Sequence, residues 1–239
     1  MKYMGSKSRI AKYIVPIIQK SIDESGTTTY IEPFCGGCNI IDSVRVDRRI
    51  ANDINPFLIA LYNAVVNRSE KLPDVITREE YANVRSNQSG FPMWYVGAVG
   101  FLASYNGKFF GGYSGVVNTR GGIRNYYDEA KRNLEAQVPH LRGVEFAYTD
   151  YNAILPKRAV IYCDPPYAGV TGYGGAPTFD HDRFWEYVRF ISEDNIVFVS
   201  EHQAPKDFEC IWQKPVTRTL DNATRAVAVE KLFQFKSTM

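Results

Sequence analysis

The stretch AVIYCDPPYAGV, residues 159–170, restricts the fold of this chain more strongly than any other segment. It is apolar and rich in β-forming residues as far as Cys163, and it then changes to an acid, two prolines and a tyrosine. Two prolines remove two backbone donors and restrict the residues before them, so the strand has to end at this point. Asp164 is therefore expected just beyond the carboxyl end of a buried strand, with its side chain directed at whatever lies there.

The remaining sequence predicts strands that alternate with helices, which is typical of a mostly parallel α/β sheet. The expected strands are 29–34, 48–54, 144–150, 159–166 and 195–201, with a closing hairpin over 217–235. The expected helices are 39–46, 55–67, 91–106 and 127–138. Asn55 and Pro56 suit the N-cap and the first position of the second of these helices.

Residues 68–143 do not follow this alternation. We expect helices and a long glycine-rich, irregular loop over 107–124 there, and no strand, and so long a loop is usually functional or part of an inserted subdomain. Between Gly107 and Arg142 there are six Lys or Arg against three Asp or Glu, interleaved with tyrosines and asparagines. That composition suits contact with phosphates and bases, and it equally suits an ordinary solvated loop. We expect one domain of residues 1–67 and 144–239, with residues 68–143 inserted into it.

The overall composition excludes few classes of protein. At 239 residues and 45% hydrophobic, the chain is long and apolar enough for an ample core, and its net charge of +2 neither requires nor excludes a polyanionic partner. No segment has the length of a membrane span, and MKYMGSKSRI has no apolar signal-peptide core, so we expect no membrane association. Cys35 and Cys38 have the spacing of a zinc knuckle, but no second cysteine pair or histidine pair follows. We therefore expect reduced intracellular thiols and no metal.

Glycine or an acid follows four of the expected strands. Gly36 follows the first strand, Asp53 ends the second 17 residues later, and Asp150 and Asp164 end the next two. An acid about twenty residues after such a glycine turn is where the ribose hydroxyls of a nucleotide cofactor are held, although Asp53 also suits the dipole of the helix that follows it. Because parallel strands present their carboxyl ends at one edge, these residues together predict a ligand site there.

Four segments in a fixed order resemble the DNA adenine-N6 methyltransferases of the Dam type. They are KYMGSK (2–7), EPFCGG (32–37), ANDINPFLIALYN (51–63) and YCDPPY (162–167). The resemblance continues, with gaps, to about residue 200. It implies a Rossmann-like methyltransferase sheet, mostly parallel with a C-terminal antiparallel hairpin. It also implies an inserted, mainly helical subdomain for target recognition.

The same resemblance implies an enzyme that moves a methyl group from S-adenosyl-L-methionine to a flipped adenine in a short duplex DNA site, leaving S-adenosyl-L-homocysteine. The expected partner is double-stranded DNA, with no obligatory protein partner, in the cytoplasm at the nucleoid. An RNA or other amino-group methyltransferase with the same DPPY chemistry, or a catalytically silent DNA-binding relative, remains an alternative.

The chemistry explains why these residue types suit the reaction. The N6 lone pair of adenine is delocalised into the ring, so Asp164 and the carbonyl of Pro165 would accept its two N–H groups and draw the nitrogen toward tetrahedral geometry. Tyr167 offers a flat face on which a base that has left the duplex can stack. The resemblance assigns these roles: catalytic, Asp164, Pro165, Pro166 and Tyr167; cofactor-binding, Tyr3, Lys7, Phe34, Gly36, Asp53, Asp150, Tyr151 and Asp164; DNA-binding, Asn118, Arg120 and Arg124.

Some positions differ from the family pattern or stay open. Cys38 stands where a smaller residue is common after the glycine loop. Tyr173 and Phe179 correspond to aromatics near the methionine end and the base, or serve only in packing. The segment GYSGVVNTRGG resembles the recognition hairpin of the family, but IRNYYDEA after it differs from the members that read GATC, so the sequence does not predict GATC as the target.

Overall fold

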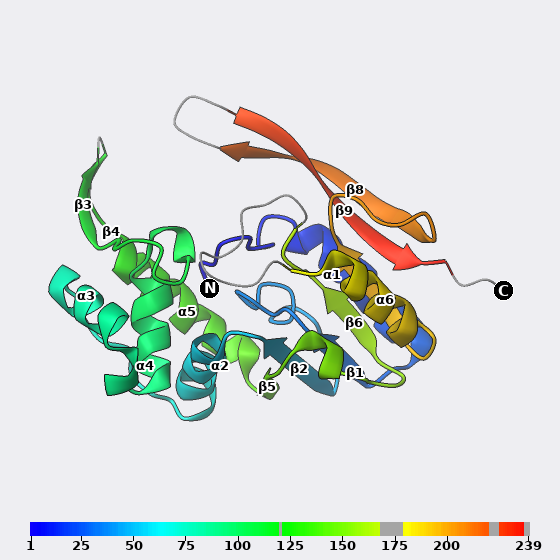
Figure 1. The fold of residues 1–239 in the computed structure, drawn as a ribbon, viewed down its shortest axis with the longest axis horizontal. Coiled ribbons are helices and arrows are strands. Elements are labelled where there is room, and N and C mark those ends of the chain that lie inside the picture. Colours follow the sequence, from blue (N-terminus) through cyan, green and yellow to red (C-terminus); the bar gives the residue numbers. More distant parts are fainter. Residues whose placement is uncertain (120, 168–178, 220–224, 237–239) are drawn as a thin grey trace.

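The computed structural model describes residues 1–119, 121–167, 179–219 and 225–236 (Figure 1). Within them, seven strands form one sheet in the order β5-β2-β1-β6-β7-β9-β8. The strands are β1 (Thr29–Glu32), β2 (Arg48–Asp53), β5 (Val144–Tyr148), β6 (Val160–Cys163), β7 (Ile196–Ser200), β8 (Phe208–Thr219) and β9 (Arg225–Phe235). All five strands predicted outside the closing hairpin are confirmed within a few residues at their ends.

The strand directions confirm the predicted fold class. β5, β2, β1, β6 and β7 run parallel, whereas β9 is antiparallel to both β7 and β8. The chain leaves β1 toward β2 on one side and later returns to pair β6 on the other. β1 and β6 therefore flank the topological switch point, where ligands bind in sheets of this type.

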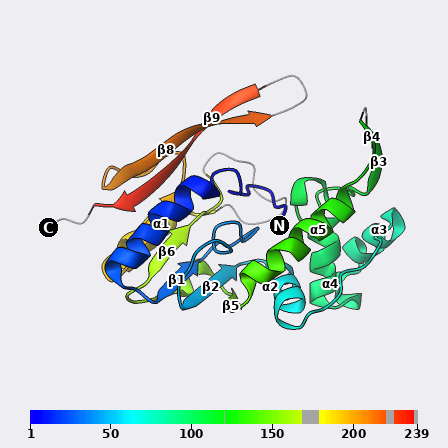
Figure 2. The ribbon, with the colours of Figure 1, turned by 180° about the vertical axis from the view of Figure 1, so that it is seen from behind.

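Helices cover both faces of the sheet, as the two opposite views show (Figures 1 and 2). α1 (Ala11–Ser25) packs Ile14, Ile18 and Ile22 against one face, and α6 (His181–Ser192) packs on the other. Successive residues of a strand point to opposite faces, so Tyr162 joins the core under α1 and Ile161 the core under α6. Burial on both faces explains why β6 and β7 read as almost continuous apolar runs.

The region from 68 to 143 consists of helices and one hairpin beside the β5 edge of the sheet (Figure 1). Its elements are α3 (Arg78–Ser86), α4 (Met93–Gly97) continued by a π-helical turn (Ala98–Leu102), β3 (Val116–Thr119), β4 (Gly122–Asn125) and α5 (Tyr126–Leu141). α4 approaches α2 (Pro56–Tyr62) so closely that a Cβ at Gly97 would lie 2.2 Å from the carbonyl oxygen of Phe57. Buried residues of this region share one hydrophobic cluster with α1, so the core runs continuously from the sheet into it.

Several expectations for individual elements need correction. Residues 39–46 form turns instead of a helix, because Gln137 on α5 bonds the carbonyls of Gly37 and Cys38 and the carboxylate of Asp42, and so holds this loop by tertiary contacts. The region 68–143 does contain strands, since β3 and β4 pair as a hairpin. The closing hairpin begins at Phe208, nine residues earlier than predicted.

The helical predictions were otherwise confirmed, with omissions. Helix 55–67 appears as α2 with a π-helical continuation (Asn63–Asn67), 91–106 as Met93–Leu102, and 127–138 within α5. The sequence analysis assigned no helix to α1, α3 or α6. None of the helices in the described part of the chain has the length and apolar character that a membrane crossing requires.

Candidate active site

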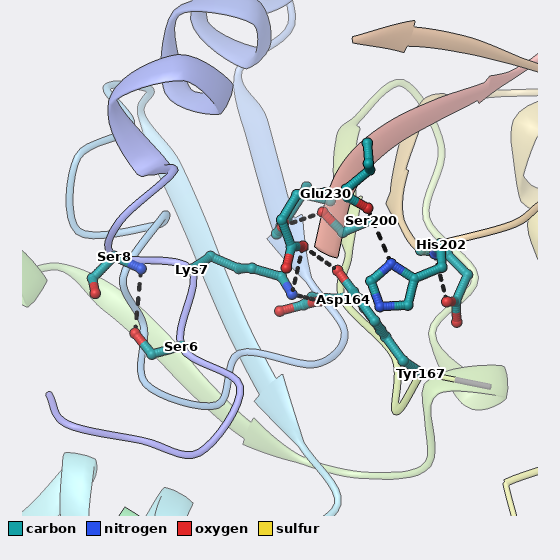
Figure 3. A network of polar contacts seen from close by, with 11 residues as sticks. Ser6, Lys7, Ser8, Asp164, Tyr167, Ser200, His202 and Glu230 are labelled. Carbon is teal, nitrogen blue, oxygen red and sulfur yellow. Dashed lines mark hydrogen bonds and ion pairs between the residues drawn. The ribbon is translucent and has the colours of Figure 1, made fainter. Parts of the chain in front are cut away.

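Asp164 lies directly after β6 at the carboxyl edge of the sheet, and a buried ammonium group faces it. Lys7 Nζ is 3.1 Å from Asp164 Oδ1, and the Lys7 side chain, from the segment before α1, is 9% exposed (Figure 3). Burial raises the pKa of Asp164 to about 6, although Lys7 lowers it and the carboxylates of Glu230 and Glu201 raise it further. Asp164 is therefore ionised at neutral pH, but its pKa lies only about one unit below neutrality.

Tyr167 closes the same cluster. Its hydroxyl donates a 3.0 Å hydrogen bond to Glu230 Oε2, and the Lys7 ammonium lies 4.1 Å from the centre of its ring. The imidazole of His202 meets the Tyr167 ring edge-on, with centroids 4.6 Å apart, and its Nδ1 is 3.1 Å from the carbonyl oxygen of Val229. Between Asp164 and Tyr167, Pro165 is buried and Pro166 is exposed. The DPPY segment is thus held by contacts from three separate parts of the chain.

Glu230 connects the C-terminal hairpin to this cluster. Its Oε2 is also 3.5 Å from Lys7 Nζ, and the side chain is buried. Glu230 lies on β9, the strand paired with β7, and its side chain is on the same face as the buried Leu232. The sequence analysis missed this residue. The available signal was a charged residue at an inward position of the alternating segment AVAVEKLFQF.

The glycine loop after β1 is tied to Asp53 at the end of β2. Gly36 N–H donates to Asp53 Oδ2 at 3.1 Å, and Asn55 N–H donates to Asp53 Oδ1 at 2.9 Å. Burial raises the pKa of Asp53 to about 6, while these backbone hydrogen bonds lower it. A carboxylate oxygen accepts more than one hydrogen bond, so Asp53 retains the capacity to bind a hydroxyl group.

Gly36 cannot be replaced by a larger residue without strain. Its φ is +44°, and a Cβ at this position would lie 2.9 Å from the ring of Tyr3. The Tyr62 hydroxyl donates to the carbonyl oxygen of Gly36 at 2.9 Å and fixes the turn from the other side. These contacts bring Tyr3, Gly36 and Asp53 together around one loop.

Aromatic residues gather beyond the ends of β1 and β5. The Phe34 ring lies 5.2 Å from Tyr151 and 5.9 Å from Phe179, centroid to centroid. Asp150 accepts the backbone N–H of Asn152 at 3.2 Å, and the side-chain Nδ2 of Asn152 is buried without a hydrogen-bond partner among the described residues. A buried donor without a partner suits a ligand that carries a hydrogen-bond acceptor, and flat aromatic faces suit a ligand with a heteroaromatic ring. Sequence reasoning did not identify Asn152.

The predicted DNA-binding residues lie elsewhere, on the β3–β4 hairpin. Asn118 pairs with Ile123 and Arg124 with Val117, so Asn118 and Arg124 project from opposite faces of the hairpin. The Arg124 guanidinium donates to both carboxylate oxygens of Glu129, and the distance from its Nη2 to Glu129 Oε2 is 2.8 Å. Arg120 lies outside the described residues, as does Tyr173.

The four cysteines are free thiols. Cys35 and Cys38 are buried beside the glycine loop, and in the described residues no group of three or more His, Cys, Asp or Glu side chains is arranged to hold a metal ion. Burial raises the pKa of the Cys35 thiol well above its usual value, so this thiol is protonated and unreactive.

Comparisons with known proteins identify the family. The family model of the D12 class N6 adenine-specific DNA methyltransferases matches residues 3–202. A Type II methyltransferase, M.FokI of Planomicrobium okeanokoites, is 26% identical over 72% of this chain and 29% of its own length. The DNA adenine methylase of Salmonella typhi is 29% identical over 64% of this chain and 61% of its own length. The matched part of this chain thus spans less than two thirds of either relative.

A solved structure of similar shape comes from a putative RNA methyltransferase of Pyrococcus horikoshii. It has a TM-score of 0.44 at 7% identity and covers 95% of this chain and 83% of that protein. This likeness is too distant to support either assignment. The fold is assigned from the strand order, and the family is assigned from the sequence match. Since that match takes in the glycine loop, Asp53 and DPPY together, the chain belongs to the D12 class of N6 adenine-specific DNA methyltransferases.

Proposed function

We propose that this chain is a site-specific DNA methyltransferase that transfers the methyl group of S-adenosyl-L-methionine to N6 of an adenine flipped out of duplex DNA. The observation that supports it most strongly is the position of DPPY at the switch point of the sheet, where Asp164 is half-buried and ionised beside Tyr167. Family membership gives the substrate class. The chain would then work in the cytoplasm at the nucleoid, where its DNA substrate lies.

The chain itself activates the amino group. Asp164 accepts one N6–H and the carbonyl of Pro165 accepts the other, so the nitrogen lone pair leaves conjugation with the ring. Pro165 and Pro166 restrict the backbone of this turn and fix the direction of that carbonyl. Tyr167 stacks on the base and holds it in the pocket. Preorganised acceptors of this kind typically contribute about 10²–10³ each to the rate.

The residues around the glycine loop fit the cofactor. The cofactor supplies an electrophilic methyl group on a sulfonium. We assign its ribose hydroxyls to Asp53, its adenine ring to the region of Phe34, Asp150 and Tyr151, and its methionine end to the neighbourhood of Tyr3, Gly36 and Lys7. The unpartnered Nδ2 of Asn152 fits this assignment because it offers a buried donor to a ring nitrogen.

Target recognition falls to residues 68–143 in this proposal. The β3–β4 hairpin exposes Val116 and Ile123 together with Asn118 on one face and Arg124 on the other. Asparagine reads adenine edges and arginine reads guanine edges or phosphates, so the two faces suit different tasks. Arg120 belongs to the same recognition set in this proposal.

The test is transfer of labelled methyl from S-adenosyl-L-methionine to duplex DNA, with duplex RNA of the same sequence as a competing acceptor. We expect label on DNA, at N6 of adenine. Modification-sensitive sequencing of DNA from cells that express the chain then gives the target site. Asp164→Asn should abolish transfer, whereas Asp194→Asn, an exposed aspartate paired with Lys157, should leave it unchanged. Preferential labelling of RNA, or no labelling of any acceptor while DNA still binds, would contradict the proposal.

A further inference from the structure

The ammonium group of Lys7 lies where the proposed reaction needs the adenine. Its Nζ is 3.1 Å from Asp164 Oδ1 and 4.1 Å from the centre of the Tyr167 ring. This inference rests on the proposed function, in which the amino group of the flipped base donates to Asp164 and the base stacks on Tyr167. Figure 3 shows the His202 imidazole on the other side of that ring, so Lys7 occupies the side left for a base.

The Lys7 ammonium lies 4.1 Å from the centre of the Tyr167 ring, on the face where the base would stack, and it pairs with the carboxylate that the adenine amino group needs. The base can therefore dock fully only when Lys7 moves away from this face. Lys7 is buried, and a buried charge that loses its partner is strongly destabilised. The exchange requires a second acceptor close by.

Glu230 is in place as that acceptor. Its Oε2 is 3.5 Å from Lys7 Nζ, so a small rotation of the lysine side chain transfers the ion pair from Asp164 to Glu230 (Figure 3). The same oxygen accepts the Tyr167 hydroxyl at 3.0 Å, which ties the stacking ring to the acceptor. The cluster thus holds two carboxylates for one ammonium group, which is the arrangement an exchange needs.

The position of Glu230 in the chain makes it new to this site. Residue 230 lies on β9, beyond the residues 3–202 that match the family and beyond every segment of the sequence resemblance. β9 is hydrogen-bonded to β7 in the main sheet, so Glu230 is presented by a regular strand rather than a loop.

We propose that Glu230 is a positioning residue for methyl transfer: it receives the Lys7 ammonium as the target adenine takes Asp164, and it holds the Tyr167 hydroxyl throughout. Asp164 then meets the amino group without a competing donor, while no buried charge is left unpaired. The residue acts through Lys7 and Tyr167 and does not itself touch the base.

The exchange has an electrostatic signature at Asp164. Burial contributes most to its raised pKa, Lys7 lowers that pKa, and Glu230 and Glu201 raise it. The groups that face this carboxylate are Lys7 before α1, Glu32 on β1, Tyr162 and Cys163 on β6, Tyr167 after it, Glu201 after β7 and Glu230 on β9. Loss of the charge at position 230 removes one repulsion, so the pKa of Asp164 falls.

The experiment compares Glu230→Gln with wild type across pH 5–9. It uses the full chain, labelled S-adenosyl-L-methionine and duplex DNA that contains the target site in unmethylated form. Glutamine keeps an acceptor for the Tyr167 hydroxyl but cannot hold the ammonium. We expect the plateau kcat to fall roughly tenfold or more, as for a misplaced reacting group, with cofactor affinity unchanged. We expect the acid limb, near pH 6 in wild type, to move to lower pH. The matched control is Glu209→Gln, an exposed glutamate on β8 of the same hairpin, which should leave both features unchanged.

Each outcome decides the matter. A lower plateau with an unmoved acid limb indicates a purely structural role and overturns the inference, as does an unchanged plateau. If Glu230→Gln does not fold, Glu230→Asp keeps the charge but withdraws it by one methylene, and a wild-type plateau in that variant overturns the inference equally. Absence of transfer by wild type and Glu209→Gln alike overturns the proposed function itself, and with it this inference.

Discussion

Asp53 and Asp164 end strands on either side of β1, and burial raises the pKa of each to about 6, yet their partners differ. Asp53 accepts two backbone N–H groups, which belong to fixed turns. Asp164 faces the side chain of Lys7, which has a second carboxylate within reach at Glu230. Two acids whose pKa values are raised alike are therefore of two kinds: one is fixed in the scaffold of the glycine loop, and the other has a partner that can be exchanged. The second kind is the one that chemistry on an incoming amino group requires.

The strongest test of this difference is Asp164→Ala. Loss of one preorganised acceptor should reduce methyl transfer by about 10²–10³ or more, because the amino group is neither activated nor docked. Cofactor affinity should fall less than the rate, since Asp53 and the glycine loop are untouched. Transfer of labelled methyl and calorimetric titration of the cofactor measure the two effects. Near-normal turnover in this variant would refute the mechanism.

Protonation should affect stability and activity in opposite directions. Each carboxyl has a pKa of about 6 in the fold against 3.8 in the unfolded chain, so between these values the native state binds more protons. The free energy of unfolding should therefore decrease as pH rises from 4 to 6, by up to about 3 kcal/mol for each group. Methyl transfer should rise across the same window, because only the Asp164 carboxylate accepts the amino protons.

Urea unfolding across pH 4–7 measures this effect, and two isosteric variants separate the acids. Asp164→Asn should flatten part of the decline and raise the unfolding free energy at pH 7, since Lys7 keeps Glu230 as its partner. Asp53→Asn should also reduce the fall of the unfolding free energy with pH. It should not raise that free energy at pH 7, because an amide offers one acceptor oxygen to two N–H donors. Identical slopes in the wild type and both variants would show that neither pKa is raised.

Asp53→Ala should act on cofactor affinity more than on saturated turnover. Its loss removes a charge-assisted contact to the ribose hydroxyls and releases the N–H of Gly36, at a cost of about 1.5–3 kcal/mol for the contact. Calorimetry should then show a roughly 10–100-fold weaker cofactor, with kcat at saturation changed far less. Glu145→Ala, an exposed acid on the neighbouring strand β5, serves as the control. Unchanged cofactor affinity in the Asp53 variant would show that Asp53 does not bind the ribose hydroxyls.

The sequence predicted the parts of this comparison that depend on motifs. The glycine loop, Asp53 and DPPY each lie at the end of a strand that the sequence predicts. Parallel strands bring their carboxyl ends to one edge of the sheet. The contact between Gly36 and Asp53 follows from that geometry. The predicted role of Lys7 in cofactor binding stays a prediction, whereas its contact with Asp164 was not foreseen.

What the sequence did not predict depends on tertiary contacts. Residues 39–46 have helical spacing but are held as turns by Gln137, about a hundred residues away in the chain. Glu230 enters the site only because β9 pairs with β7, and no local pattern specifies which strand a C-terminal hairpin joins. Asn152 is recognisable only once its amide is seen to be buried.

The smallest effect is expected on the β3–β4 hairpin, where an exposed ion pair contrasts with the buried one at Asp164. Arg124 is paired with Glu129 at the surface, and such pairs contribute only about 0–1 kcal/mol, so the guanidinium is available to DNA at little cost. If Arg124 contacts a phosphate, Arg124→Ala should weaken binding to all duplexes alike and reduce the salt dependence by about one charge. Asn118→Ala, on the opposite face, should instead relax preference at one base pair by about 1–3 kcal/mol. DNA affinity across salt concentrations, together with methylated-site profiles, distinguishes the two, and Arg48→Ala, at an exposed pair with Glu145, is the control. If neither hairpin variant changes affinity, salt dependence or site preference, recognition lies outside these two residues and the hairpin is only a connection.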